Sequence, residues 1–127
     1  MTKHDDRQGG QIVISGAGGA LGTRLTTHFS SPKQPVLALD RHFDTGIEES
    51  ENLRRRCLDL TSGSQVRDAL EAAFADHGRI ELLVNAVGMI WNAPMFKLEQ
   101  GQLNPHDLDD WRTVIEANLT APFVVAS

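Results

Sequence analysis

A glycine-rich turn between a short apolar run and a helical pattern limits most strongly how this chain can fold. Residues 11–15 read QIVIS, a β-branched run that is typical of a buried strand. Glycines end that run abruptly, at Gly16, Gly18, Gly19 and Gly22. Apolar residues then recur at four-residue spacing, at Leu21, Leu25 and Phe29. The sequence therefore predicts a strand, a glycine turn and a helix that begins inside the turn.

The same alternation of strand and helix continues along the chain. Residues 36–39 form a second apolar run, closed by Asp40-Arg41, and a third short strand is expected at residues 57–60. A helical face at Val66, Ala69, Leu70, Ala73 and Phe74 leads to a fourth strand at residues 80–84. Such alternation predicts an α/β fold with a parallel sheet of about four strands.

The remaining segments are harder to assign. Residues 44–51 are acid-rich and predict an exposed loop or a short helix, and residues 89–110 predict an extended loop with some local helix. A last helix is expected, with a face made of Trp111, Val114, Ile115, Asn118 and Leu119, and Pro122 is expected to kink it. The apolar edge of the fourth strand and this helix face are expected to lack partners.

Composition narrows the class of protein. The chain has 127 residues, 40% of them hydrophobic, which fits one small domain over residues 11–127 behind a polar leader at 1–10. A formal charge of −5 argues against a nucleic-acid partner. One cysteine, five scattered histidines and no apolar run of about 18 residues predict a cytoplasmic protein without a metal site or a membrane segment.

The glycine turn has the chemistry of a phosphate cradle. Glycines allow close approach of the backbone, and the helix that follows offers free N–H groups and a positive dipole end. No Gly-Lys-Ser/Thr follows, so it is not a Walker loop, and the Gly16, Gly19, Gly22 spacing departs from a strict G-x-G-x-x-G register. The alternative is that these glycines serve packing alone.

Asp40 stands where the second strand is expected to end. In a dinucleotide-binding fold, a carboxylate at this place accepts hydrogen bonds from the adenosine ribose and repels a 2′-phosphate. NAD(H) is therefore favoured over NADP(H), although the neighbouring Arg41 softens that preference. The alternative is an ordinary acid at the start of a surface loop.

Several motifs together resemble the short-chain dehydrogenase/reductase family. Residues 15–22 look like its glycine-rich cofactor turn, with Ser15 in place of Thr, and Asp59-Leu60 looks like its adenine-contacting pair. Residues 84–88 (VNAVG) are similar to its Asn-Asn-Ala-Gly motif, and residues 110–119 resemble the stretch that carries its tetrad asparagine, here Asn118. The resemblance covers the chain from residue 11 onward and implies a Rossmann-like doubly wound sheet, truncated after about four strands.

The resemblance also implies roles for particular residues. The pyrophosphate would lie on the turn, the adenosine ribose against Asp40 and Arg41, and the adenine against Asp59 and Leu60. The nicotinamide-side ribose would lie against the end of the fourth strand. The full cofactor-binding set implied in this way is Ser15, Gly16, Gly18, Gly19, Ala20, Leu21, Gly22, Asp40, Arg41, Asp59, Leu60, Asn85, Ala86, Val87 and Gly88.

Some positions depart from the family pattern. Ala20 stands where the classical branch has a glycine, while the Asn85 and Asn118 motifs look classical. The family's catalytic Ser, Tyr and Lys are missing, and the chain contains no tyrosine at all. Only Asn118 of the catalytic tetrad is present, so this chain alone is expected to be inactive.

The expected function is therefore the NAD(H)-binding, N-terminal part of an oxidoreductase that interconverts an alcohol and a ketone of small-molecule size. A fragment, one half of a split enzyme and a free-standing nucleotide-binding module all remain open. The alternative function is a non-catalytic dinucleotide-binding or structural subunit that pairs with another chain. Family members commonly form dimers or tetramers, so a second copy or a complementary C-terminal half is the expected partner.

Overall fold

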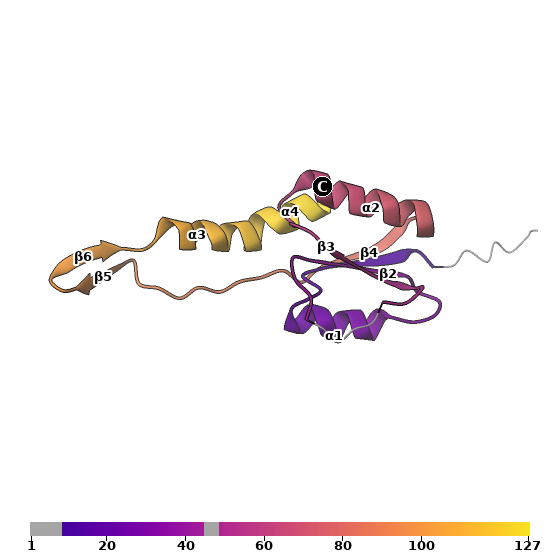
Figure 1. Ribbon diagram of the computed structural model, residues 1–127, viewed down its shortest axis with the longest axis horizontal. Coiled ribbons are helices and arrows are strands. Elements are labelled where there is room, and N and C mark those ends of the chain that lie inside the picture. The colour runs from indigo at the N-terminus through magenta and orange to yellow at the C-terminus, as the bar shows by residue number, and fades with distance from the viewer. Residues whose placement is uncertain (1–8, 45–48) are drawn as a thin grey trace, which may run out of the picture.

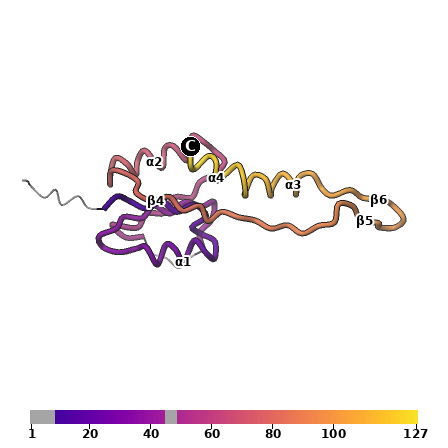
Figure 2. The backbone as a smooth tube through the Cα atoms, turned by 180° about the vertical axis from the view of Figure 1, so that it is seen from behind, coloured from indigo at the N-terminus to yellow at the C-terminus, as the bar shows by residue number. Residues whose placement is uncertain are grey.

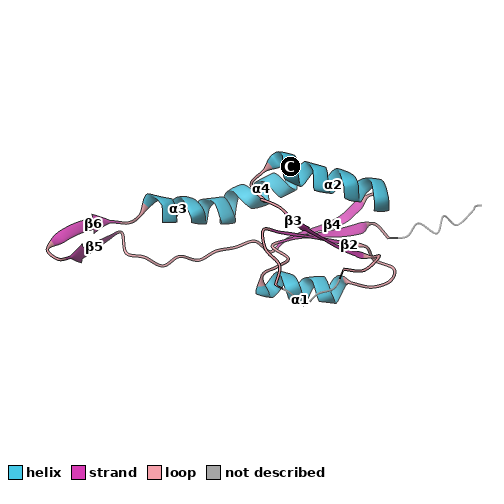
Figure 3. Cartoon of the chain, in the orientation of Figure 1, coloured by secondary structure: helices cyan, strands magenta, loops and turns pink. Residues whose placement is uncertain are grey.

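The centre of the molecule is a parallel sheet whose strand order is β3-β2-β1-β4. The structure is a computed structural model, and it describes residues 9–44 and 49–127. The strands are β1 (Gln11–Ser15), β2 (Val36–Asp40), β3 (Leu53–Cys57) and β4 (Ile80–Asn85). Figure 3 shows helices on both sides of this sheet, as the predicted α/β fold requires.

The two central strands hold the driest part of the core. All five residues of β1 are buried, and so are the first four of β2. In the parallel register, Ile12 lies beside Val36 and Ile14 beside Ala38. A strand that is covered on both faces needs no polar alternation, which explains why these strands read as continuous apolar runs.

Each face of the sheet has its own helical layer (Figure 1). Helix α1 (Ala20–Phe29) covers the face of Ile12 and Ile14, where its Leu25 and Phe29 pack. Helices α2 (Gly63–His77) and α4 (Ala121–Ala126) cover the opposite face, where Val13 joins a cluster with side chains from both helices. The helical face expected on α2 is confirmed at Val66 and Ala73, which are buried, whereas Phe74 is largely exposed.

The third strand lies earlier in the chain than the sequence predicted. It spans Leu53–Cys57, with three consecutive arginines in its middle, instead of residues 57–60. An edge strand has one side toward solvent, so its apolar content is a poor guide to its position, and charged side chains suit it. Residues 58–60 form the loop after the strand, where Leu58 and Leu60 are buried and Asp59 is exposed.

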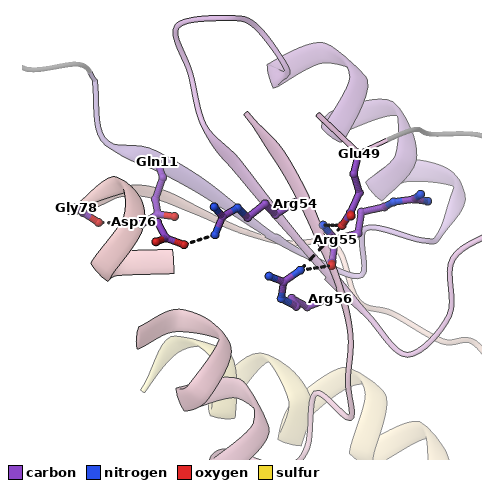
Figure 4. Close-up of polar contacts among 7 residues, drawn as sticks. All are labelled: Gln11, Glu49, Arg54, Arg55, Arg56, Asp76 and Gly78. Atoms are coloured by element: carbon purple, nitrogen blue, oxygen red, sulfur yellow. Dashed lines mark hydrogen bonds and ion pairs between the residues drawn. The ribbon is translucent and has the colours of Figure 1, made fainter. Parts of the chain in front are cut away.

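Polar contacts fix the strands to α2 (Figure 4). Arg54 of β3 forms an ion pair with Asp76 near the end of α2. The buried side chain of Gln11 donates from Nε2 to the carbonyl oxygen of Gly78, at 2.8 Å. A buried amide needs such a partner, so this bond sets where β1 begins relative to the end of α2.

Residues 86–107 form an arm that extends away from the sheet, and the helix that follows it leads the chain back toward the sheet (Figure 2). The arm contains an antiparallel hairpin of β5 (Phe96–Glu99) and β6 (Gln102–Pro105), followed by α3 (Leu108–Ile115). The expected extended loop is thus partly right, but the helix expected within residues 89–110 is limited to 108–110, where α3 begins, and a hairpin occupies residues 96–105. The sequence contains a two-residue Gln100-Gly101 turn, which lacks the Asn-Gly signature by which hairpins are usually recognised.

The last helix is interrupted, as expected near Pro122. A π-helical turn, Glu116–Thr120, separates α3 from α4, and Pro122 lies at the start of α4. Proline has no N–H for the preceding turn, so the regular bonding pattern is broken there. Trp111 and Leu119 are more than half exposed, and β4 forms an edge of the sheet with Ile80 and Leu82 partly exposed. These are the surfaces that were expected to lack partners.

Candidate functional site

The glycine turn lies between β1 and α1, and most of its glycines are required by close packing within the chain. Gly16 has a φ of +72°, and a Cβ there would lie 2.6 Å from the carbonyl carbon of Ala86. A Cβ on Gly22 would lie 2.0 Å from the carbonyl oxygen of Gly16. For these positions the packing explanation is sufficient.

Gly18 ties the turn to the end of β2. Its backbone N–H donates to Oδ2 of Asp40 at 2.9 Å, and a Cβ on it would lie 2.0 Å from the carbonyl oxygen of His42. The other carboxylate oxygen of Asp40 accepts from the backbone N–H of Arg41 at 2.6 Å. The half-buried Asp40 is therefore held in one orientation by two main-chain donors.

Gly19 is different from the other glycines of the turn. A Cβ there would meet only the carbonyl oxygen of Gly16, at 3.4 Å, and the residue lines an open cavity. Nothing in the packing of the chain itself demands a glycine. A ligand that approaches the backbone closely is the physical reason that fits this position.

The carboxyl ends of β1 and β4 are joined by a side-chain bond. The hydroxyl of Ser15, which is fully buried, donates to Oδ1 of Asn85 at 2.6 Å. The N–H of Ala86 continues the strand pairing by donating to the carbonyl oxygen of Ser15. Ser15 and Asn85 therefore act on the shape of the strand ends, and neither lines the cavity.

Asp59 lies in the loop after β3, and its carboxylate is held by Thr61. Oδ1 accepts from the hydroxyl of Thr61 at 2.7 Å and from its backbone N–H at 2.9 Å. These two bonds lower the pKa of Asp59 below its usual 3.8, and the bond from the hydroxyl has the larger effect. The positive charge of Arg41 lowers this pKa further. Asp59 is therefore an anion at neutral pH.

Asn118, on the π-helical turn, is hydrogen-bonded to the backbone of Met89. Its Oδ1 accepts from the N–H of Met89 and its Nδ2 donates to the carbonyl oxygen of Met89, both at 2.8 Å. The amide thereby fixes the start of the arm beside the last helix. In this arrangement its side chain is a structural link.

A cavity of about 510 Å³ lies at the carboxyl ends of the strands. In parallel α/β sheets this edge is the usual place for a ligand. The cavity brings together nine of the residues that the sequence singled out, which are Gly16, Gly19, Asp40, Arg41, Asp59, Leu60, Ala86, Val87 and Gly88. It is not lined by Ser15, Gly18, Ala20, Leu21, Gly22, Asn85 or Asn118.

Sequence reasoning missed one wall of this cavity. This wall is formed by helix α3, the π-helical turn and the first residue of α4, and it contains Asp109, Arg112, Thr113, Glu116, Ala117 and Ala121. Thr61 and Met89 complete the lining. Arg112 forms an ion pair with Asp109, at 3.2 Å. Most of these residues lie in the predicted last helix and within the motif at residues 110–119, but that motif singled out only Asn118, and the contact of this helix with the cavity depends on the tertiary fold.

The cavity combines glycine backbone, two carboxylates at strand ends and the start of a helix. This set fits a ligand that carries both a phosphate and hydroxyl groups, because helix amides bind the anion and carboxylates accept from the hydroxyls. Among residues 9–44 and 49–127, no group of three or more His, Cys, Asp or Glu side chains is placed to hold a metal ion. None of the described helices is long and apolar enough to cross a membrane.

Comparisons with curated proteins place this fold in a family. A family model described as short chain dehydrogenase matches residues 10–127. The chain is 27% identical over 125 residues to a 3-oxoacyl-[acyl-carrier-protein] reductase of Thermotoga maritima, and the match covers 93% of this chain and 48% of that protein. It is 28% identical over 117 residues to the human 3-hydroxyacyl-CoA dehydrogenase type-2, covering 89% of this chain and 44% of that protein.

Solved structures agree with this placement at the level of the fold. A short chain dehydrogenase from Leptospira borgpetersenii with bound NAD+ superposes with a TM-score of 0.73 at 18% identity, over 94% of this chain and 44% of that one. The chain spans about half the length of the curated relatives it matches. The resemblance inferred from the motifs is thereby confirmed, and the chain belongs to the short-chain dehydrogenase family.

Proposed function

We propose that this chain is the NAD(H)-binding part of an oxidoreductase that interconverts an alcohol and a ketone. The observation that supports it is the position of Asp40, whose carboxylate lines the cavity beside Gly19 and is oriented by the N–H groups of Gly18 and Arg41. A fixed carboxylate at the end of the second strand accepts from a ribose diol and repels a 2′-phosphate.

The glycine turn would hold the pyrophosphate through a subset of its amides. The N–H of Gly18 already donates to Asp40, and that of Gly19 donates to the carbonyl oxygen of Gly16. Ala20, Leu21 and Gly22 occupy the first turn of α1, where helix amides lack intrahelical acceptors. We therefore propose that the pyrophosphate lies against Gly19 in the cavity and reaches the amides of these three residues, which begin α1 next to the cavity wall but do not line it.

The rest of the cofactor follows the cavity walls. Arg41, next to Asp40 in the cavity wall, would also contact the ribose, and Asp59 and Leu60 would contact the adenine. The strand end at Asn85, Ala86, Val87 and Gly88 would hold the nicotinamide-side ribose, with Ser15 and Asn118 as supports for that edge. The nicotinamide supplies hydride transfer when it is bound, and the chain orients it.

Cofactor titration tests this proposal. The purified chain is titrated with NADH and with NADPH, and binding is followed by nicotinamide fluorescence. We expect tighter binding of NADH, and we expect Asp40→Asn to narrow the difference, because it removes the charge while keeping an oxygen that accepts from Gly18. The control is Asp68→Asn, on the exposed surface of α2. Tighter binding of NADPH by the unsubstituted chain would refute the assignment of Asp40.

A second candidate is a non-catalytic subunit that binds a dinucleotide or pairs with another chain. The 127 residues contain no tyrosine, so in either case the family's proton donor is not among them. The two candidates differ in one measurement. Oxidation of secondary alcohols by the longer polypeptide, or by a complex of this chain with a partner, supports the enzyme, and cofactor binding without turnover supports the subunit.

A further inference from the structure

The β5–β6 hairpin has one apolar face that the rest of the described chain leaves uncovered. In the antiparallel register, Phe96 lies opposite Pro105 and Leu98 opposite Leu103, so these four side chains share one face. Lys97 lies opposite Asn104 and Glu99 opposite Gln102 on the other face. Phe96, Leu98 and Leu103 are 60%, 73% and 65% exposed. A lone two-stranded hairpin of this kind is only marginally stable in water.

The hairpin also has a free edge, and it is the edge of β5. The N–H of His106 donates to the carbonyl oxygen of Met95 at 2.8 Å, so Met95 directs its main chain toward β6. Main-chain groups alternate along a strand, and those of Phe96 and Leu98 therefore point away from β6. Among the described residues β5 pairs only with β6. The outer edge of β6 is the poorer partner, because Pro105 has no N–H to donate.

The sequence of this edge is complementary to itself. When two β5 strands run antiparallel about a two-fold axis at Leu98, Leu98 faces the partner's Leu98. Lys97 then lies opposite the partner's Glu99, and Glu99 lies opposite the partner's Lys97. An axis at Lys97 instead places two lysines together, and an axis at Glu99 places two glutamates together. Only the arrangement about Leu98 matches the charges and uses the outward main-chain groups.

We propose that the free edge of β5 pairs with β5 of a second copy of this chain to form a four-stranded sheet. The two hairpins join through main-chain hydrogen bonds at Leu98, and two charge pairs fix the register. Figure 1 shows the hairpin at the end of the arm, away from the sheet, where a second copy approaches without meeting the body of the molecule. This surface is separate from the cavity, so the inference holds or fails independently of the proposed function.

Reversing the charge of Lys97 or of Glu99 tests the pairing between two copies and leaves the fold of each chain intact. Lys97→Glu places two like charges together at both ends of the contact, and Glu99→Lys does the same with the opposite sign. Within one chain, Lys97 and Glu99 lie opposite the neutral Asn104 and Gln102, so the hairpin itself is little affected. We expect each single variant to weaken dimerisation about tenfold, as measured by sedimentation over a concentration series.

A mixture of the two single variants gives the decisive result. A heterodimer of Lys97→Glu with Glu99→Lys has matched charges at both pairs, so we expect the mixture to associate better than either variant alone. Lys33→Glu, on an exposed turn, makes the same change of net charge and is expected to leave dimerisation unchanged. A chain that is monomeric at all concentrations overturns the inference. So does an association that the single variants leave unchanged, or a mixture that associates no better than its components.

Discussion

Asn118 and Met89, 29 positions apart, are joined by two hydrogen bonds of 2.8 Å that use both ends of one side-chain amide. The link connects the π-helical turn to the first residues of the arm, just beyond the end of β4. It holds the strand end and the last helix on either side of the cavity. A side chain that satisfies both a donor and an acceptor of one residue replaces the strand partner that this segment lacks.

Replacing Asn118 with alanine removes both bonds, and we expect the free energy of unfolding to fall by about 1–2 kcal/mol. The amide hydrogen of Met89 is also expected to exchange faster with solvent, because it loses its acceptor. Denaturant unfolding and amide exchange measure the two effects. Asn92→Ala, on the exposed arm, is the matched control and should change neither. A Met89 amide that exchanges at the same rate in Asn118→Ala would contradict the role given to this link.

Gly22→Ala is expected to destabilise the chain by about 3 kcal/mol, because its Cβ would lie 2.0 Å from the carbonyl oxygen of Gly16. Backbone at that distance can move only by displacing α1 from the sheet. Gly63→Ala is the control, since a Cβ at Gly63 meets no atom within 4 Å and alanine favours the helix. Thermal unfolding separates the two variants. Equal stability of Gly22→Ala and the unsubstituted chain would contradict the packing described for the turn.

Gly19→Ala is expected to lower the free energy of unfolding by no more than about 1 kcal/mol, because its Cβ would meet only one atom, at 3.4 Å, and the remaining cost is that of alanine at the N-cap of α1. If the pyrophosphate lies above this residue, the same substitution weakens NADH binding at least tenfold. Denaturant unfolding and a fluorescence titration on the same sample measure the two quantities. Unchanged NADH affinity would place the pyrophosphate away from Gly19, and a large loss of stability would show that packing requires this glycine.

The central strands were predictable because a strand that is buried on both faces is a continuous run of apolar residues, and glycines mark the turn after the first of them. Residues 11–15 and 36–39 are such runs, and β1 and β2 lie there, with β2 extended by Asp40. Asp40 was singled out by its place at the end of the second strand and Asp59 by the family resemblance, and both line the cavity. The cavity lining agrees with nine of the expected positions.

The edges of the molecule were less predictable for the converse reason. Three arginines occupy β3, where solvent on one side removes the requirement for apolar residues. The hairpin was not predicted because its turn is Gln100-Gly101, with glutamine in place of the asparagine of the usual Asn-Gly turn. Arg112 and Thr113 lie on a helix that the sequence did predict, but the contact of that helix with the cavity depends on the tertiary fold, which no local pattern encodes.

Thr61→Val is expected to raise the pKa of Asp59, because the hydroxyl bond from Thr61 is the largest cause of its lowered value. A carboxyl pKa lowered by folding stabilises the native state above the unfolded pKa, and this contribution is lost as pH falls through the folded pKa. Thr61→Val should therefore lose less stability on acidification below about pH 4.

Carboxyl NMR titration measures the pKa of Asp59 in both proteins, and denaturant unfolding at several pH values measures the stability. Thr27→Val removes a hydroxyl that bonds a helix carbonyl and touches no carboxylate, so it controls for the loss of a hydroxyl as such. A pKa for Asp59 that does not move in Thr61→Val would show that Thr61 does not hold the carboxylate in solution.

Gln100→Asn is expected to stabilise the β5–β6 hairpin. Gln100 and Gly101 have φ values of +50° and +76°, as in a two-residue turn of type I′. Most residues pay roughly 1–2 kcal/mol in this left-handed region, and asparagine enters it more readily. The bond from the N–H of His106 to Met95 closes the far end of the hairpin, so the exchange rate of that amide reports its population. We expect the amide of His106 to exchange about threefold more slowly in Gln100→Asn.

Gln102→Asn is the control, because it places the same side chain in a strand, where asparagine is disfavoured, and it should not slow this exchange. Faster exchange in Gln100→Asn would mean that Gln100 stabilises the turn by some contact other than its backbone geometry.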